Sequence, residues 1–82
     1  MTTSNELFRL IAAALKLPLS AIDLTTSMQT TEAWDSLAHM ELIISLEEHY
    51  RIMLEADQIA EMTSVAAVVD QLRQRGLLDD EA

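Results

Sequence analysis

The amino-acid sequence predicts a small all-α protein, a bundle of four helices in which three are long and one is short. Apolar residues recur at spacings of three and four, and no segment alternates apolar and polar residues as a half-buried strand would. One glycine and one proline among 82 residues leave little material for hairpin turns. The length suits a single domain over residues 1–82, with a folded core at about 4–76 and an acidic tail at 77–82.

The first helix is expected to begin at a capping box over residues 3–6, in which Thr3 and Glu6 satisfy each other's backbone N–H groups. Pro18 is expected to end it. Residues 19–35 form the longest irregular stretch, rich in serine and threonine. A disordered linker would rarely contain so many large apolar residues, so we expect this loop to be pinned across the core. These residues are Leu19, Ile22, Leu24, Met28 and Trp34.

The spacing of apolar residues and the cap residues predict three further helices. The second spans about residues 36–50, and a short third helix spans about 57–61. The fourth begins at a cap formed by Thr63 and Ser64 and ends at Gly76. We expect the acidic residues 79–81 to be frayed. The predicted core collects the apolar residues on the inner faces: Leu7, Leu10, Ile11, Ala14, Leu15, Leu42, Leu46, Tyr50, Ile59, Val65, Val68 and Leu72.

Composition narrows the classes of function. The absence of cysteine excludes disulfides, thiolate metal ligands and cysteine nucleophiles, and it fits a reducing compartment. A net charge of -9, from 14 acidic and 5 basic residues, argues against nucleic acid and anionic membranes and favours basic protein surfaces as partners. No basic segment leads into an apolar run, and no apolar stretch is long enough to cross a membrane. We therefore expect no signal peptide, no membrane span and a cytoplasmic location.

The second predicted helix is apolar on two faces. On a helical wheel, one side, the core face, carries Leu42, Ile43, Leu46 and Tyr50. Nearly opposite lies a second apolar stripe, interleaved with acids: Leu37, Met40, Glu41, Ile44, Glu47 and Glu48. The helix is either central, with the long loop covering its second side, or it exposes a docking face. Six acids and no lysine or arginine between Leu17 and Tyr50 favour docking onto a basic surface.

The start of this helix carries the most informative motif, Trp34-Asp35-Ser36-Leu37. A serine at a helix N-terminus is most often a cap, but the unpaired N–H groups and the positive end of the helix dipole also favour a phosphate there. Asp35-Ser36-Leu37, followed by Glu41-Leu42 and by Leu46-Glu47-Glu48, resembles the acyl carrier proteins over about residues 4–75. The resemblance implies that Ser36 bears 4′-phosphopantetheine. It also implies that Asp35 marks the site for the transferase and helps to coordinate its magnesium ion, and that Leu37 anchors the loop-to-helix junction or a partner pocket.

The same resemblance implies a function. The chain would be a monomeric, non-catalytic carrier of acyl thioesters in fatty-acid, polyketide or related specialised biosynthesis. Its partners would be a phosphopantetheinyl transferase and acyl-loading and acyl-processing enzymes with basic docking surfaces. The acidic stripe would form the partner-recognition surface. The Asp-Ser-Leu form favours acyl cargo over the aminoacyl or peptidyl cargo of related carriers, which remain an alternative.

Other readings of the same residues are weaker. Asp35, Ser36 and His39 could suggest a hydrolase, but the sequence lacks a nucleophile elbow and the glycines of an oxyanion turn. His39 and His49 are not spaced as a metal pair, and we expect both to be at the surface or half-buried. No calcium-binding loop pattern occurs among the acids. A small acidic adaptor without a prosthetic group is the main competitor from another class.

Overall fold

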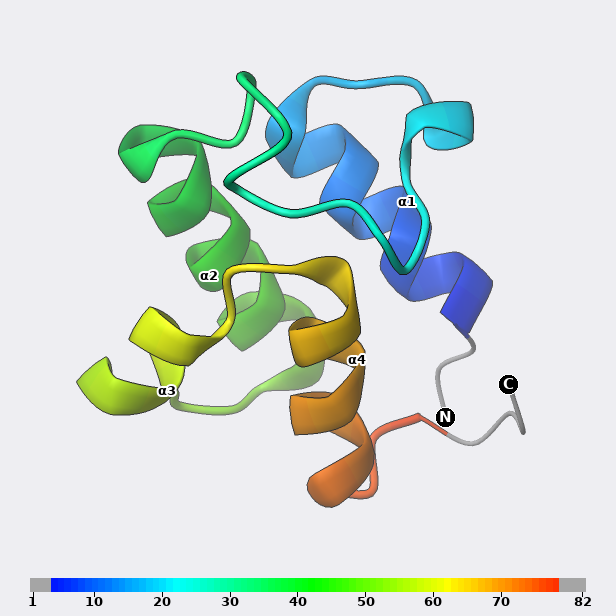
Figure 1. Cartoon of the computed structure of the whole chain (residues 1–82). Helices are drawn as coiled ribbons and strands as arrows, with labels where there is room; N and C mark the ends of the chain where they lie inside the picture. Colours follow the sequence, from blue (N-terminus) through cyan, green and yellow to red (C-terminus); the bar gives the residue numbers. More distant parts are fainter. Residues whose placement is uncertain (1–3, 79–82) are drawn as a thin grey trace.

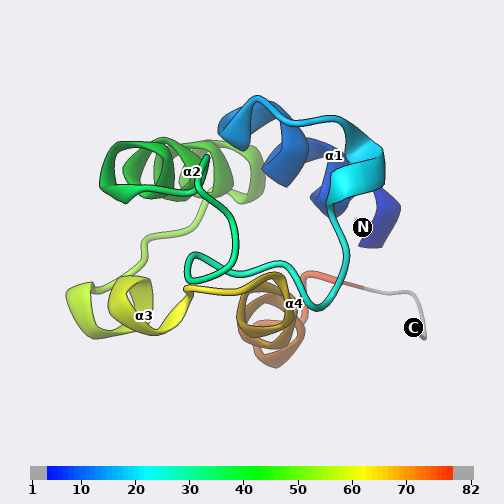
Figure 2. The same cartoon turned by 45° about the horizontal axis from the view of Figure 1, so that its top comes forward.

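A computed structural model describes residues 4–78, which form four α-helices and one short 3₁₀-helix (Figure 1). The elements are α1 (Ser4–Leu15), η1 (Leu19–Ala21), α2 (Ser36–Tyr50), α3 (Ala56–Glu61) and α4 (Val65–Gln74). In Figure 2, α1 and α2 lie in one layer and α3 and α4 in the other, and the loop from Ile22 to Asp35 runs between them. The predicted all-α class, with three main helices and one short one, is confirmed. No helix within residues 4–78 is long and apolar enough to cross a membrane.

Helices α1 and α2 end at their C-termini in the same way. Lys16, with φ of 59°, and Arg51, with φ of 56°, adopt the left-handed conformation that stops a helix. The N–H of Leu17 then donates to the carbonyl of Ala12, and the N–H of Ile52 donates to that of Glu47. Helix α1 therefore ends before Pro18, which is not its terminator as predicted. The Thr3 half of the proposed capping box lies outside the described residues.

The predicted bounds of the later helices agree with the structure. Helix α2 covers the predicted range, and α3 begins one residue earlier than expected. The Ser64 hydroxyl caps α4 by accepting a hydrogen bond from the N–H of Ala67 at 3.1 Å. Gly76 follows α4 with a φ of 74°, a conformation that glycine adopts without steric cost.

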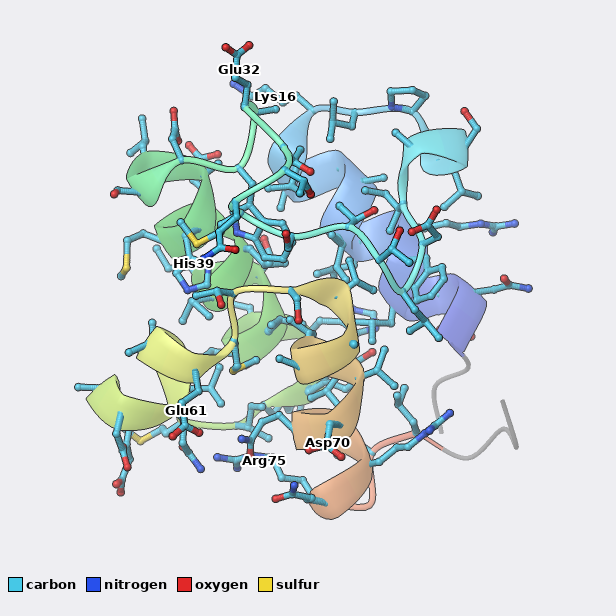
Figure 3. The ribbon with its side chains drawn as sticks, in the orientation of Figure 1. Lys16, Glu32, His39, Glu61, Asp70 and Arg75 are labelled. Atoms are coloured by element: carbon cyan, nitrogen blue, oxygen red, sulfur yellow. The ribbon has the colours of Figure 1, made fainter. Side chains whose placement is uncertain are left out.

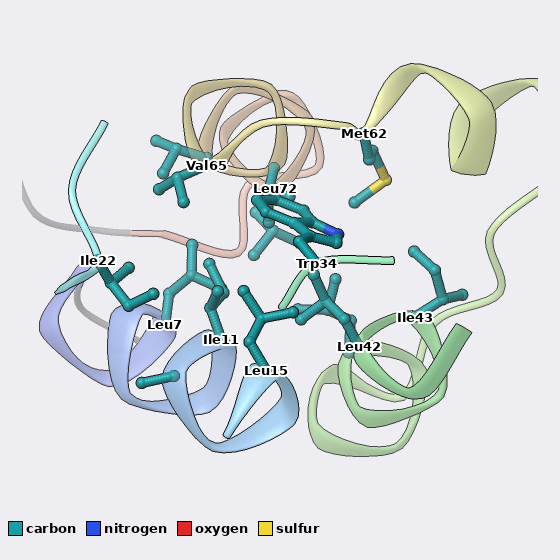
Figure 4. Packing of buried hydrophobic residues seen from close by; sticks show 14 of the residues in the cluster. Leu7, Ile11, Leu15, Ile22, Trp34, Leu42, Ile43, Met62, Val65 and Leu72 are labelled. Carbon is teal, nitrogen blue, oxygen red and sulfur yellow. The ribbon is translucent and has the colours of Figure 1, made fainter. Parts of the chain in front are cut away.

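The core is formed by inward-facing residues of α1, α2 and α4, with Trp34 of the loop among them (Figure 4). Eight of the twelve predicted core residues are buried, whereas Leu10, Ala14, Tyr50 and Ile59 are half-buried and pack around the edge. Eight buried hydrophobic residues are missing from that predicted list. Ile22 and Trp34 were expected to be pinned with the loop and Ile43 to lie on the core face of the second helix, whereas Ala12, Leu54, Met62, Val69 and Leu78 were not assigned to the core. Leu77 also packs against the core. The packed region thus extends at least two residues beyond the expected boundary at 76, and residues 79–81 lie outside the described part.

The long loop is only partly pinned as predicted. Trp34 and Ile22 are buried and Met28 packs against the core, but Leu19 and Leu24 are exposed. A turn centred on Asp23 holds the intervening segment, because its carboxylate accepts hydrogen bonds from the side chain and the N–H of Thr25. These bonds, the side-chain one first, hold the pKa of Asp23 below its usual range.

Leu46→Ala is expected to lower the free energy of unfolding by about 2–5 kcal/mol, because Leu46 is completely buried on the core face of α2. Ile44→Ala on the same helix is the matched control. Its side chain is half exposed, so the loss there should stay near 0.5 kcal/mol, roughly the spread of surface substitutions. Urea unfolding followed by circular dichroism measures both values. Equal losses for the two variants would contradict the orientation of α2.

Candidate functional site

Ser36 is the first residue of α2 and is exposed to solvent. The residue before it, Asp35, is the cap: its backbone is extended, and its carboxylate accepts a hydrogen bond from the N–H of Ala38 at 2.9 Å. The Asp35 carbonyl accepts the N–H of His39 at 2.8 Å. The Ser36 hydroxyl is therefore not needed as the cap of α2 and is left for other chemistry.

The surroundings of Ser36 fit a phosphodiester. In the first turn of a helix the leading N–H groups have no intrahelical acceptor, and the helix dipole places partial positive charge there. A shallow hollow of about 170 Å³ is lined by residues on both sides of Ser36 in the sequence, Ala33, Asp35, Leu37 and Ala38, together with Lys16 and Glu41. Asp35, Ser36 and Leu37 are all exposed, so solvent-filled space is available for a covalent group on the serine. The residues present therefore fit a phosphate-linked attachment.

The apolar stripe on α2 is exposed and not covered by the loop. Leu37 is 71%, Met40 47% and Ile44 50% accessible to solvent. Glu41 and Glu48 are exposed beside them. The interpretation of α2 as a central helix buried on both faces is therefore wrong. A second shallow hollow, of about 380 Å³, lies between α1 and α2. Glu41 and Ile44 are among the residues that line it.

Glu47 differs from the other acids of the stripe. It is half-buried, and its carboxylate accepts a hydrogen bond from the N–H of Leu54 at 3.0 Å. The carboxylate thereby ties the end of α2 to the connection that leads into α3. Glu47 thus has a structural contact that its position on the helical wheel does not reveal.

His39 is buried, and the expectation of a surface or half-buried side chain is wrong for it. It is 8% exposed and lies on the side of α2 that faces α3 (Figure 3). Its Nδ1 accepts a hydrogen bond from the indole N–H of Trp34, and its Nε2 lies 2.9 Å from the carbonyl oxygen of Ile59. Both ring nitrogens are thus engaged in the interior, so His39 cannot serve as a base for Ser36. His49 is exposed, as expected.

Sequence reasoning missed the pairing of Trp34 with His39, although a signal for it was present. On the helical wheel His39 falls between Leu46 and Ile43, on the core face of α2. A histidine at such a position needs buried partners for both nitrogens. Trp34, an indole donor directly before the helix, supplies one of them.

The chain is similar to known proteins in both sequence and structure. Residues 5–72 match the family described as the phosphopantetheine attachment site. The chain is also similar to the solution structure of a holo acyl carrier protein from Geobacter metallireducens, with 29% sequence identity and a TM-score of 0.73. That similarity covers 100% of this chain and 98% of the other. No protein in the curated set matches.

The structure combines a four-helix fold with an exposed serine at the start of its second helix, and the matched family is one of phosphopantetheine-bearing carrier domains. The chain belongs to the phosphopantetheine attachment-site family, and it is similar in fold and sequence to an acyl carrier protein. The prosthetic group of this family is 4′-phosphopantetheine.

Proposed function

We propose that this protein carries acyl groups as thioesters on a 4′-phosphopantetheine arm attached to Ser36, and that it catalyses no reaction itself. The observation that carries the proposal is the exposed Ser36 at the N-terminus of α2, directly after a cap that Asp35 provides. When bound, the arm supplies a terminal thiol that holds the acyl group. The chain's own residues supply attachment, orientation and recognition.

Attachment is a phosphoryl-type transfer for which a transferase and coenzyme A are the co-reactants. Ser36 Oγ forms a bond to the phosphorus that bears pantetheine, the pyrophosphate bond to 3′,5′-ADP breaks, and the serine proton passes to the transferase or solvent. Asp35 uses one carboxylate oxygen for the cap of α2. Its second oxygen is proposed to help hold the magnesium ion that the transferase brings. Leu37, exposed next to the serine, is proposed to anchor the junction in the transferase.

The partner surface is proposed to be the stripe of Leu37, Met40, Glu41, Ile44, Glu47 and Glu48. Its apolar members are exposed along α2, and Glu41 and Glu48 lie at the rim. A small apolar patch with an acidic rim suits brief contacts with several basic enzymes in turn. Glu47 also shapes this surface by holding the chain at Leu54.

The proposed cargo is an acyl group that comes from a biosynthetic pathway. Fatty-acid, polyketide or related specialised synthesis would supply the acyl cargo, and the Asp-Ser-Leu motif supports acyl over aminoacyl groups. A monomer in the cytoplasm is proposed, in line with the strong negative charge and the absence of cysteine. Presenting the arm-bearing protein with acyl-activating and aminoacyl-activating enzymes separates the two kinds of cargo, because only one set should form a thioester.

Intact mass spectrometry tests the proposed function. Incubation with a phosphopantetheinyl transferase, magnesium and coenzyme A is expected to add about 340 Da, the mass of the arm. Fragmentation should place the increment on the peptide that contains Ser36. An unchanged mass would support the alternative, an acidic adaptor without a prosthetic group.

Charge reversal and apolar truncation on α2 should affect different rate constants. Glu48→Lys is expected to slow association with a basic partner enzyme about threefold to tenfold and to flatten its salt dependence, because exposed charges steer encounter. Met40→Ala should mainly speed dissociation, because its contact forms after encounter. Stopped-flow binding at several salt concentrations measures both rates. Asp70→Lys, an exposed acid on α4, is the control, and an equal effect there would contradict a localised surface.

A further inference from the structure

Trp34, His39 and Ile59 are joined by a continuous hydrogen-bond relay inside the molecule. The indole N–H of Trp34 donates to His39 Nδ1 over 3.0 Å, and His39 Nε2 lies 2.9 Å from the Ile59 carbonyl oxygen. An indole nitrogen can only donate, so Nδ1 must accept. Nε2 then carries the proton and donates to the carbonyl. The relay therefore requires one tautomer of the imidazole, the Nε2–H form.

The relay links three elements next to the candidate attachment site. Trp34 is the second-last residue of the long loop, His39 lies in the first turn of α2, and Ile59 lies in α3. Trp34 is 1% exposed and packs in the centre of the core, in the same region as Leu42 and Leu72 (Figure 4). Helix α3 has six residues and none of them is buried, although Ile59 packs against the edge of the core, so polar ties such as this one add to the attachment of α3.

Helix α3 is also tied on its other side, through Gln58. The Gln58 side chain accepts a hydrogen bond from Arg75 at 3.0 Å and donates one to Gln71 at 3.4 Å. These bonds fasten α3 to α4 and to the segment after it. Loss of the His39 bond would therefore leave α3 attached to α4 while its tie to α2 is removed. Breaking the relay should therefore loosen α3 from α2 without releasing it from α4.

We propose that His39 is a positioning residue for the modification of Ser36, acting through Trp34; this rests on the proposed function. Trp34 is one residue before Asp35, whose carboxylate caps α2, so the place of the indole sets the direction in which the chain enters the helix. The ring is fixed by packing and by its bond to Nδ1. Without that bond the ring at position 34 is held by packing alone, so the ring and the helix entry can move together over a wider range.

Removal of the relay should change the turnover of the transferase more than its binding. The stripe on α2 would stay in place because its side chains face away from the relay, so KM should remain within about twofold. The Ser36 hydroxyl would sample a broader range of positions relative to the reacting phosphorus. A less precise position of the attacking oxygen lowers kcat, and we expect a fall of about tenfold.

The double variant Trp34→Phe/His39→Phe is the main test. It removes the indole donor and the imidazole together, so no buried N–H is left unpaired, and the Ile59 carbonyl still accepts the N–H of Met62. Trp34→Phe alone also breaks the relay but leaves His39 Nδ1 without its donor, and it is the second test, with the same fall in kcat expected, if the double variant does not fold. His49→Phe replaces the exposed histidine on the same helix and is the matched control, expected to leave kcat and KM unchanged.

Three readouts decide the proposal. Intact-mass kinetics with transferase and coenzyme A should give the fall in kcat, and hydrogen exchange of the α3 amides should quicken while that of α4 does not. Nitrogen-15 shifts of the wild-type imidazole should report the Nε2–H tautomer. A folded variant with wild-type kcat, or the opposite tautomer in the wild type, would overturn the proposal. Failure of the wild type to accept the arm would instead count against the proposed function, while the tautomer and the exchange rates still test the relay.

Discussion

Replacement of Ser36 by alanine is expected to abolish attachment of the arm completely. The mass increment of about 340 Da should be absent after incubation with transferase and coenzyme A, because alanine has no oxygen to bond to phosphorus. Ser20→Ala, at an exposed serine of η1, is the matched control and should accept the group at the wild-type rate. An increment that persists in Ser36→Ala would refute the assignment of the site.

The stability of the same variant tests the local geometry. Because Asp35 is the cap of α2, Ser36→Ala should change the free energy of unfolding by less than about 0.5 kcal/mol. Asp35→Ala removes the acceptor of the Ala38 N–H and should cost about 0.5–2 kcal/mol. Urea unfolding measures both. The reverse order of losses would mean that the serine, not the aspartate, caps the helix.

Replacement of Trp34 by alanine is expected to cause the largest loss of stability, about 3–5 kcal/mol. The ring is almost fully buried at the centre of the core, and its removal leaves a cavity and an imidazole nitrogen without its donor. A small domain has a total stability of about 5–15 kcal/mol, so the variant is expected to lie close to its unfolding threshold.

Leu24→Ala is the matched control for this loss, because Leu24 belongs to the same loop but is 52% exposed. Its effect should remain near 0.5 kcal/mol, roughly that of a surface substitution. Circular dichroism in urea measures both variants without relying on tryptophan fluorescence. A loss below about 1 kcal/mol for Trp34→Ala would mean that the loop is not anchored through the core.

The helices and the candidate site follow from local patterns in the sequence. The second helix, the cap of the fourth and the glycine that follows it depend on residues within a few positions of one another, so spacing alone predicts them. The position of Ser36 at the start of α2 is equally local. The exposure of Leu37, Met40 and Ile44 required a choice between two interpretations, and the charge pattern favoured the correct one.

Only the tertiary structure decided which side chains of the irregular segments enter the core. Trp34 and Leu24 are both large apolar residues of one loop, yet one is buried and the other exposed, because a loop has no period that assigns its faces. The bond of His39 to the Ile59 carbonyl and the contact of Glu47 with Leu54 depend on partners 20 and 7 residues away. Such pairings arise when elements pack against one another, and the spacing of residues along one helix carries no information about what the neighbouring element presents.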